Sequence, residues 1–427
     1  MEQRRKNLTQ LFIPICLETL LYMLSGMVDT LMLSSVNDQA VGAVGTANTY
    51  IGIFIIMFSV ISSGMVAVMT QNIGAGRPGV AYQARQLGLA FNAVLGIILS
   101  LILAFGAGTI LAGVGVADAL MQPARTYLQI VGGFCILNAL IPICSSYLRA
   151  FGFSKEPLYA SIIGNVINFC LNAFFLFVLH KGVAGVATAT VVSRIINLGI
   201  VVLLGAVLVK AKKHPERESN REVMGQIIRI GLPSACETLV IRFLNQMDAQ
   251  GLNVTARSYT MQITNFSYCV GAALAQANAI MTGWRIGAKE YDACDRGTRK
   301  AAIIGVIVAV ILETMFALCS GWIMQLFSKD PQMVSLVGKL LAIDIVLEMG
   351  RVTNLVYGQA LKTSGDAVFP VVMGACFMIL CSVGGTYLFG IRLGLLAVGA
   401  YIGMAGDECV RAIGMYLRWK SGKWKEK

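Results

Sequence analysis

The sequence predicts an all-α integral membrane protein with twelve transmembrane helices in two six-helix lobes related by an internal repeat. Three observations lead to this fold class: an apolar composition, a regular series of apolar runs, and a duplication of the first half in the second. Of the 427 residues, 56% are hydrophobic and 13% are charged, whereas a soluble domain carries about 25% charged residues. The mean hydropathy is +0.72. This composition predicts a membrane protein.

Apolar runs long enough to cross a membrane follow one another along the chain. A transmembrane helix needs about 20 consecutive apolar residues, and short polar or basic segments separate the runs of this length. The first run follows MEQRRKNLTQ and is too long for a signal peptide, so we expect it to remain as a helix. The predicted helices are 9-34, 47-73, 87-113, 122-149, 157-179, 184-209, 227-252, 258-284, 299-325, 333-361, 367-389 and 393-418.

Basic residues predict how these helices are oriented. Most of the 34 Lys and Arg residues fall in loops on one side of the predicted topology, and cytoplasmic loops are enriched in Lys and Arg. The turn at 35-45, on the other side, has neither. We therefore expect both termini in the cytoplasm and the protein in a bacterial plasma membrane. Because the net charge of +12 lies beside membrane helices, we attribute it to topology and membrane lipids and expect no nucleic-acid partner.

The second half of the chain repeats the first. Residues 13-29, IPICLETLLYMLSGMVD, align without a gap to 232-248, LPSACETLVIRFLNQMD. The tripeptide IGA recurs at 73-75 and 286-288. Six helices in each half preserve the orientation of the second repeat, so the lobes are parallel repeats with a substrate cleft expected between them. We predict an N-terminal lobe at 1-209, a basic cytoplasmic linker at 210-226 and a C-terminal lobe at 227-427.

The first helix carries a proline and two acids within an apolar run. Pro14 lacks an N–H and predicts a bend, and Glu18 and Asp29 are spaced to share one helix face. A charge near the bilayer centre costs about 3 kcal/mol on insertion scales. These acids should therefore face a wet cavity or a partner, and for each a structural ion pair or a neutral buried acid remains the alternative. Pro233, Glu237 and Asp248 repeat the pattern.

The fifth and sixth helices supply uncharged polar groups. Asn165, Asn168 and Asn172 form a stripe along the fifth helix, and Thr188, Thr190 and Ser193 lie in the sixth. Amide and hydroxyl oxygens with one carboxylate suit a hard cation or a proton relay. Hydrogen bonding between helices is the alternative.

Charged residues also occur in the tenth and last helices. Asp344, Glu348 and Arg351 share one face, and Arg351 is near enough to pair with Glu348. Asp344 is then the better candidate for a site. Arg411 follows Glu408 by three residues, which predicts a structural pair.

The sequence gives no sign of an enzyme. Neither HExxH nor GxSxG occurs. The eleven Cys lie mostly in apolar helices without CxxC spacing, so we interpret them as small buried residues. His180 and His214 have no neighbours typical of metal ligands.

Short motifs occur in the order found in one family of secondary transporters. They are Pro14 and Asp29 in the first helix, QNIGA at 71-75, LRAFG at 148-152, NFCLN at 168-172 and GVAGVATAT at 182-190. With these motifs and the duplication, essentially the whole chain resembles the multidrug and toxic-compound extrusion (MATE) family.

The resemblance implies an antiporter that exports amphipathic, cationic organic compounds by alternating access in exchange for H⁺ or Na⁺. It implies no cofactor beyond this coupling ion, a small-molecule substrate and membrane lipids as partners, and we expect a monomer. The implied coupling-cation site, which is also the possible Na⁺ site, comprises Asp29, Asn168, Asn172 and Thr190. The second-lobe candidates are Glu237, Asp344 and Glu348. The substrate-cleft candidates are Glu18, Tyr22, Met27 and Asp248.

One position departs from the family pattern, because Asn172 stands where the family has Asp. The amide keeps an oxygen ligand but removes a negative charge, which weakens electrostatic binding of Na⁺. The choice between H⁺ and Na⁺ therefore stays open.

Other functions fit less well. A lipid-linked oligosaccharide flippase of the same superfamily is the alternative, and it would need Arg and Lys along the cleft to bind pyrophosphate. A major-facilitator transporter also has twelve helices, but its basic motif between helices two and three is not evident in GAGRPGVAYQAR. A receptor or channel would need a ligand-binding domain or a filter-like segment.

Overall fold

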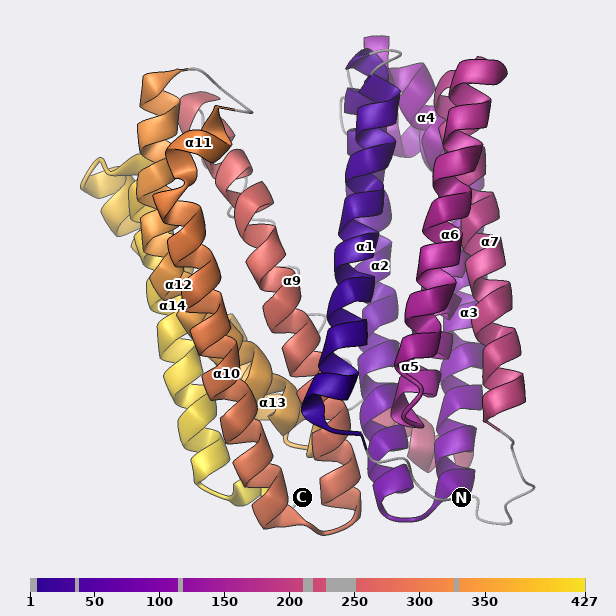
Figure 1. The fold of residues 1–427 in the computed structure, drawn as a ribbon, viewed down its shortest axis with the longest axis vertical. Helices are drawn as coiled ribbons and strands as arrows, with labels where there is room; N and C mark the ends of the chain where they lie inside the picture. The colour runs from indigo at the N-terminus through magenta and orange to yellow at the C-terminus, as the bar shows by residue number, and fades with distance from the viewer. Residues whose placement is uncertain are drawn as a thin grey trace. The chain divides into compact units, whose positions relative to one another are not determined.

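The computed structural model describes residues 6–34, 38–113, 118–209, 218–227, 251–325 and 330–426. Throughout these ranges the chain is helical and contains no β-strand (Figure 1), which confirms the all-α class. The predicted seventh helix at 227-252 falls almost entirely outside the described residues, and so do Glu237 and Asp248.

The chain divides into two compact units. The first comprises Met1–Met69 and Arg77–Gly231, and the second comprises Thr70–Gly76 and Leu232–Lys427. The finer boundaries of the lobes and the linker stay a prediction.

The first unit is a bundle in which α6 packs against α1 and α7, while α3 packs against α4 and α5. Its apolar core includes Phe58, Leu103 and Val186, which are buried. Its elements are α1 (Leu8–Ser34), α2 (Asp38–Gly74, with its last turn in the second unit), α3 (Pro78–Gly113), α4 (Asp118–Gly133), α5 (Ile136–Ala150), α6 (Lys155–Ala173), the π-helix η1 (Phe174–Val178) and α7 (Gly182–Leu208).

The predicted helix at 122-149 is a bent pair, because α4 and α5 meet at an angle of 43°. A Cβ on Gly132 would lie 2.9 Å from the Leu103 Cβ, so glycine lets α4 approach α3 closely at this point. The Ile136 N–H at the start of α5 donates to Ser100 Oγ at 3.0 Å. This bond satisfies a backbone donor that the break leaves without a helical partner.

Pro14 lies inside α1, which continues through it. Proline cannot donate to the carbonyl four residues earlier, and that carbonyl, on Gln10, instead accepts a hydrogen bond of 2.9 Å from Ser154 Oγ. The buried serine thus compensates for the missing N–H. The predicted bend at Pro14 stays a prediction.

The second unit is built around α12, which packs against α9, α10 and α14. The Gln71 side chain donates to the Thr363 carbonyl, which ties the last turn of α2 to α12. The elements are α9 (Gly251–Gly287), α10 (Tyr291–Leu318), α11 (Ser320–Met324), α12 (Pro331–Thr363), α13 (Val368–Phe377), the π-helices η2 (Met378–Val383) and η3 (Thr386–Arg392), α14 (Leu396–Lys420) and the 3₁₀ helix η4 (Lys423–Glu426).

Matching turns show the internal repeat. Gly152 follows α5 with φ 86°, and Gly365 follows α12 with φ 95°. In each turn the N–H after the glycine returns to a leucine carbonyl, from Phe153 to Leu148 at 2.9 Å and from Asp366 to Leu361 at 3.0 Å. These are the hydrogen bonds of the Schellman motif, and the segments LRAFG at 148-152 and LKTSG at 361-365 both have leucine at the first position and glycine at the last.

Within the described ranges, six helices are long and apolar enough to cross a membrane, or seven if the bent pair α4 and α5 counts as one span. The chain is therefore an integral membrane protein by helix length and composition, while the count of twelve stays a prediction.

Candidate functional site

A polar pocket in the first unit brings Asp29 of α1 to two asparagines of α6. The Asn172 amide Nδ2 donates to Asp29 Oδ1 at 2.6 Å and to Asn168 Oδ1 at 3.3 Å. Asn168 and Asn172 are four residues apart and so share one face of α6, and this helix packs against α1. The structure thus joins three residues of the predicted coupling-cation site.

The pocket contains an oxygen that accepts no hydrogen bond. Asn172 Oδ1 is buried, and nothing in the described part of the chain donates to it. A buried polar atom without a partner is costly. Beside a partly buried carboxylate, such an oxygen is suited to a cation or to the proton of a neutral acid.

Thr190, the fourth predicted member, lies buried on α7. Its hydroxyl donates to the Val186 carbonyl of its own helix at 2.9 Å. Ser193 likewise donates to the Thr190 carbonyl at 2.9 Å. The helix α7 contacts both α6 and α1, but the Thr190 hydroxyl donates its hydrogen bond within α7, so only its lone pairs are free for a cation.

Arg194 and Tyr127 belong to the surroundings of Asp29, and the sequence analysis missed both roles. Arg194 interacts electrostatically with Asp29, and Tyr127 interacts with both. Arg194 Nη1 is buried without a hydrogen-bond partner among the described residues. Arg194 follows Thr190 by four residues, so helical spacing could have identified it. Tyr127 lies on α4, and nothing in the sequence places it near α1.

The substrate-cleft candidates are spread over different environments. Glu18 of α1 accepts a hydrogen bond from Arg149 of α5, and both side chains are largely buried. This contact is the structural ion pair that the sequence left as the alternative. Tyr22 is exposed. The Met27 side chain and Asp248 lie outside the described residues.

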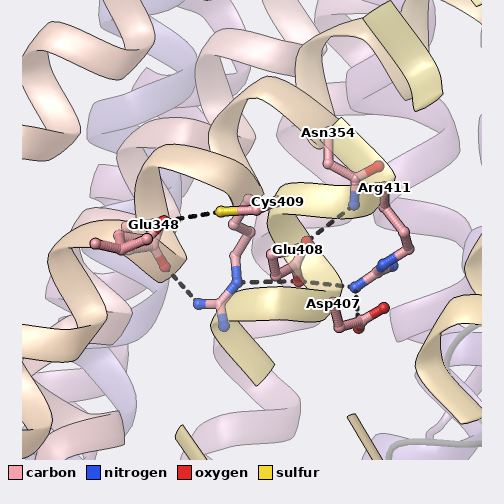
Figure 2. Close-up of polar contacts among 8 residues, drawn as sticks. Glu348, Asn354, Asp407, Glu408, Cys409 and Arg411 are labelled. Atoms are coloured by element: carbon pink, nitrogen blue, oxygen red, sulfur yellow. Dashed lines mark hydrogen bonds and ion pairs between the residues drawn. The ribbon is translucent and has the colours of Figure 1, made fainter. Parts of the chain in front are cut away.

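The second unit holds a buried network of charged side chains between α12 and α14 (Figure 2). Arg351 pairs with Glu348 on its own helix, and its Nε lies 3.5 Å from Glu408 Oε1. Arg411 lies 2.9 Å from Glu408 Oε1. Both pairs predicted from helical spacing, Arg351 with Glu348 and Arg411 with Glu408, are therefore confirmed.

Further contacts extend this network. Arg411 also lies 2.9 Å from Asp407 Oδ2, and Asn354 Nδ2 donates to Glu408 Oε2 at 3.0 Å. Asp344, one turn before Glu348, is buried and has an oxygen, Oδ2, that accepts no hydrogen bond among the described residues. Two arginines thus face an excess of carboxyl groups.

Glu313 of α10 is the acid that the sequence analysis passed over. Its side chain is completely buried, and no described residue donates to either carboxyl oxygen. It interacts electrostatically with Asp344 and Glu348 of α12. The sequence feature that could have identified Glu313 is its position as the single charged residue in the apolar segment AVILETMFAL.

Across the described ranges no group of three His, Cys, Asp or Glu side chains is placed to hold a metal ion. The described cysteines are free thiols. Any cation at Asp29 would therefore use amide or hydroxyl oxygens beside the single carboxylate.

Comparison with known proteins places this arrangement in a family. A family model described as MatE matches the chain twice, at residues 14–174 and 231–388. An uncharacterized transporter of Bacillus subtilis, YisQ, is 34% identical to this chain. The alignment covers 97% of this chain and 94% of YisQ. A probable multidrug resistance protein of Thermotoga maritima, NorM, is 24% identical, with 99% of this chain and 94% of that protein covered.

Solved structures share the fold. A crystal structure of MATE in the bent conformation has a TM-score of 0.89 at 19% identity, with 98% of this chain and 96% of that chain covered. An outward-facing multidrug resistance MATE family transporter of the MOP superfamily has a TM-score of 0.88 at 18% identity, with the same coverage. Each alignment covers nearly the whole chain, so the similarity of fold includes both units.

Proposed function

Because the chain belongs to the MatE family of multidrug and toxic-compound extrusion transporters, we propose that it exports amphipathic, cationic organic compounds in exchange for H⁺ or Na⁺ by alternating access. It acts as a monomer in a bacterial plasma membrane, with both termini in the cytoplasm. It performs no covalent chemistry and needs no cofactor beyond the coupling ion. Membrane lipids are its other partners.

The observation that supports this proposal is the pairing of Asp29 with Asn172 beside an oxygen that accepts no hydrogen bond. A carboxylate within a membrane helix is costly unless a cation or donor compensates it. The Asn172 amide supplies one donor and Arg194 supplies a positive charge that interacts with Asp29, and a coupling ion supplies the rest of the compensation. Antiport then requires that ion and substrate bind to different states of the transporter, because a ligand shifts a conformational equilibrium only by its differential affinity.

The test is efflux of ethidium, a permanent cation, from proteoliposomes under an imposed Na⁺ gradient and, separately, an imposed pH gradient. We expect one of these gradients to drive efflux by the wild type. Loss of a charged ligand costs about 1.5–3 kcal/mol, so Asp29→Asn should weaken the response to the driving ion roughly 10- to 100-fold.

Glu222→Gln is the control for Asp29→Asn, because Glu222 is an exposed acid in the helical segment 220–227 of the same unit. It should transport like the wild type. Equal efflux by Asp29→Asn and the wild type would remove Asp29 from the mechanism. Efflux that responds to neither gradient would rule out the antiporter.

A flippase for lipid-linked oligosaccharides would instead need free basic groups along its path. Arg351 and Arg411 are both engaged by carboxylates. These two arginines therefore give the flippase no support.

A further inference from the structure

The Asp29 pocket of the first unit contains a positive charge as well as a carboxylate. Arg194 lies on α7 and interacts electrostatically with Asp29 and with the buried Tyr127 of α4. Glu18, the other acid of α1, pairs with Arg149. Arg194 therefore balances the charge of Asp29, and together these two residues contribute no net charge when both are ionised.

Hydrogen bonds between α1 and α6 fix the register of these two helices. Asn165 Nδ2 donates to the Leu21 carbonyl at 3.3 Å. Further along, Asn172 Nδ2 donates to Asp29 Oδ1 at 2.6 Å. The two bonds join residues 144 and 143 positions apart, so the helices are parallel and Asn172 marks the level of Asp29 on α6.

Close contacts show that α7 is antiparallel to α6. A Cβ on Gly164 of α6 would lie 3.3 Å from the Asn197 Cβ of α7. Just beyond the end of α6, a Cβ on Gly185 of α7 would lie 2.7 Å from the Phe175 Cβ. Residues later in α7 therefore lie beside residues earlier in α6.

This register brings the Arg194 guanidinium toward Asp29. The backbone of Arg194 lies between one and two helical turns from the level of Asn172. Side chains of a helix lean toward its N-terminus, and in α7 this direction leads from Arg194 to the level of Asn172 and Asp29. The long side chain of Arg194 thus extends toward the carboxylate with which it interacts.

Two buried atoms of this pocket lack a hydrogen-bond partner among the described residues, and they are complementary. Arg194 Nη1 is a donor, and Asn172 Oδ1 is an acceptor. Each costs free energy while it has no partner. A small movement of the Arg194 side chain toward Asn172 would satisfy both groups without any added ion.

The same pocket is a poor site for Na⁺. A hard cation takes several oxygen ligands, but the Asn172 amide donates to both Asp29 Oδ1 and Asn168 Oδ1, so an N–H group already lies beside these oxygens. Na⁺ would also add a second positive charge to that of Arg194 beside a single carboxylate. Like charges repel strongly in a medium of low dielectric constant.

We propose that Arg194 determines the ion specificity of the first unit, because its guanidinium takes the place of a bound cation beside Asp29 and thereby excludes Na⁺. A group tethered to the protein acts at a high effective concentration, so free Na⁺ competes poorly with it. A guanidinium keeps its charge at physiological pH, so the exclusion does not depend on pH. Arg194 lies outside the motifs through which the chain resembles its family.

The experiment measures the Na⁺ binding that depends on Asp29. Radioactive Na⁺ bound by the purified full chain in detergent is compared with that bound by the same protein carrying Asp29→Asn, so that Na⁺ bound elsewhere cancels. We expect no difference for the wild type. Arg194→Met removes the charge and keeps an unbranched side chain, so it should gain a saturable Na⁺ site that Asp29→Asn abolishes.

Melting temperatures give a second measure of the same site. Na⁺ that binds the folded protein stabilises it, so replacing choline chloride by sodium chloride should raise the melting temperature of Arg194→Met by about 2 °C or more. The part of this shift that Asp29→Asn removes should be absent from the wild type.

Three further variants separate the charge from the structural role of the side chain. Arg194→Gln keeps a hydrogen-bond donor without the charge and should gain the same Na⁺ site. Arg194→Lys keeps the charge and should lack that site. Arg125→Met removes an exposed arginine from α4 of the same unit and should match the wild type.

Two results would overturn the proposal. One is Na⁺ binding by the wild type that Asp29→Asn abolishes, and the other is a failure of both Arg194→Met and Arg194→Gln to gain a Na⁺ site. The wild-type comparison needs no change at Arg194, so it remains decisive if these variants misfold.

This inference rests on the proposed antiport, and efflux distinguishes the two. If a Na⁺ gradient drives ethidium efflux by the wild type and Asp29→Asn abolishes that response, the antiporter stands and the role of Arg194 fails. If efflux by the wild type responds to neither gradient, the antiporter fails, and the binding measurements still decide whether Arg194 excludes Na⁺.

Discussion

Asn172 is the residue at which this chain departs from its family pattern, and in the structure its side-chain amide is a hydrogen-bond donor. Its Nδ2 donates to both Asp29 and Asn168. An aspartate at this position could donate to neither. The substitution Asn172→Asp would therefore replace a hydrogen bond by two adjacent carboxylates that only a cation or a proton can hold together.

We expect Asn172→Asp to make the protein depend on Na⁺. Loss of the hydrogen bond and the new repulsion should destabilise the Na⁺-free protein by about 1–3 kcal/mol, and saturating Na⁺ should recover much of this through binding to the folded state. Melting temperatures in Na⁺ and in choline buffer measure both effects. Asn172→Ala, which removes the hydrogen bond without adding a charge, is the control and should show no recovery by Na⁺.

The predictability of these sites depended on how far apart their residues lie in the sequence. Asn168 and Asn172 were predicted as neighbours because helical spacing fixes which residues share a face. The partner of Glu18 was not predictable, because Arg149 lies 131 residues away and only the packing of α1 near α5 joins them. Glu313 was overlooked for a similar reason, since its importance depends on α12.

At the level of helices, apolar length predicted the six spans found in the described ranges, and the bent pair, but it did not predict where the helices end or break. The predicted helix at 87-113 begins at Pro78 in the structure, and that at 258-284 spans Gly251–Gly287. Each extension is polar or mixed, so hydropathy alone does not mark it. The break between α4 and α5 depends on close contact of Gly132 with Leu103 of another helix, which a single-helix pattern cannot show.

The ends of α2 and α9 show how the repeat has diverged. Gly76 follows α2 with φ 76°, and Lys289 occupies the corresponding position after α9 with φ 61°. A left-handed conformation costs a residue with a Cβ roughly 1–2 kcal/mol relative to its usual conformations, whereas glycine adopts it freely.

We therefore expect Lys289→Gly to stabilise the second unit by about 1 kcal/mol and to raise the melting temperature by about 2 °C. Lys289→Ala separates backbone conformation from loss of the exposed charge, because alanine keeps the Cβ. It should give no comparable gain. A larger increase for alanine than for glycine would show that removal of the charge, and not relief of backbone strain, stabilises the protein.

At the scale of the whole molecule, basic segments lie together within each unit. In the first unit, Arg77, after α2, pairs with Glu218 of the predicted linker at 2.8 Å. In the second unit, the C-terminal Trp424 stacks on Trp419 with ring centres 4.2 Å apart, and Trp419 Nε1 donates to Asp295 Oδ1 of α10 at 2.9 Å. The linker therefore contacts the basic loop after α2, and the C-terminal tail packs beside the start of α10. The sequence assigns both of these regions to the cytoplasmic side.

These contacts give a prediction about orientation, because segments that touch in a folded unit must lie on the same side of the membrane. We expect green fluorescent protein fused after Lys427 to fluoresce and alkaline phosphatase fused there to be inactive. Phosphatase fused at residue 36, between α1 and α2, should be active, since the segment 35-45 lacks Lys and Arg and the positive-inside rule assigns it to the opposite side. Phosphatase inserted at His214 in the linker serves as the matched cytoplasmic control. An active phosphatase at Lys427 together with an inactive one at His214 would contradict an even number of spans in the second half, because the linker and the tail would then lie on opposite sides.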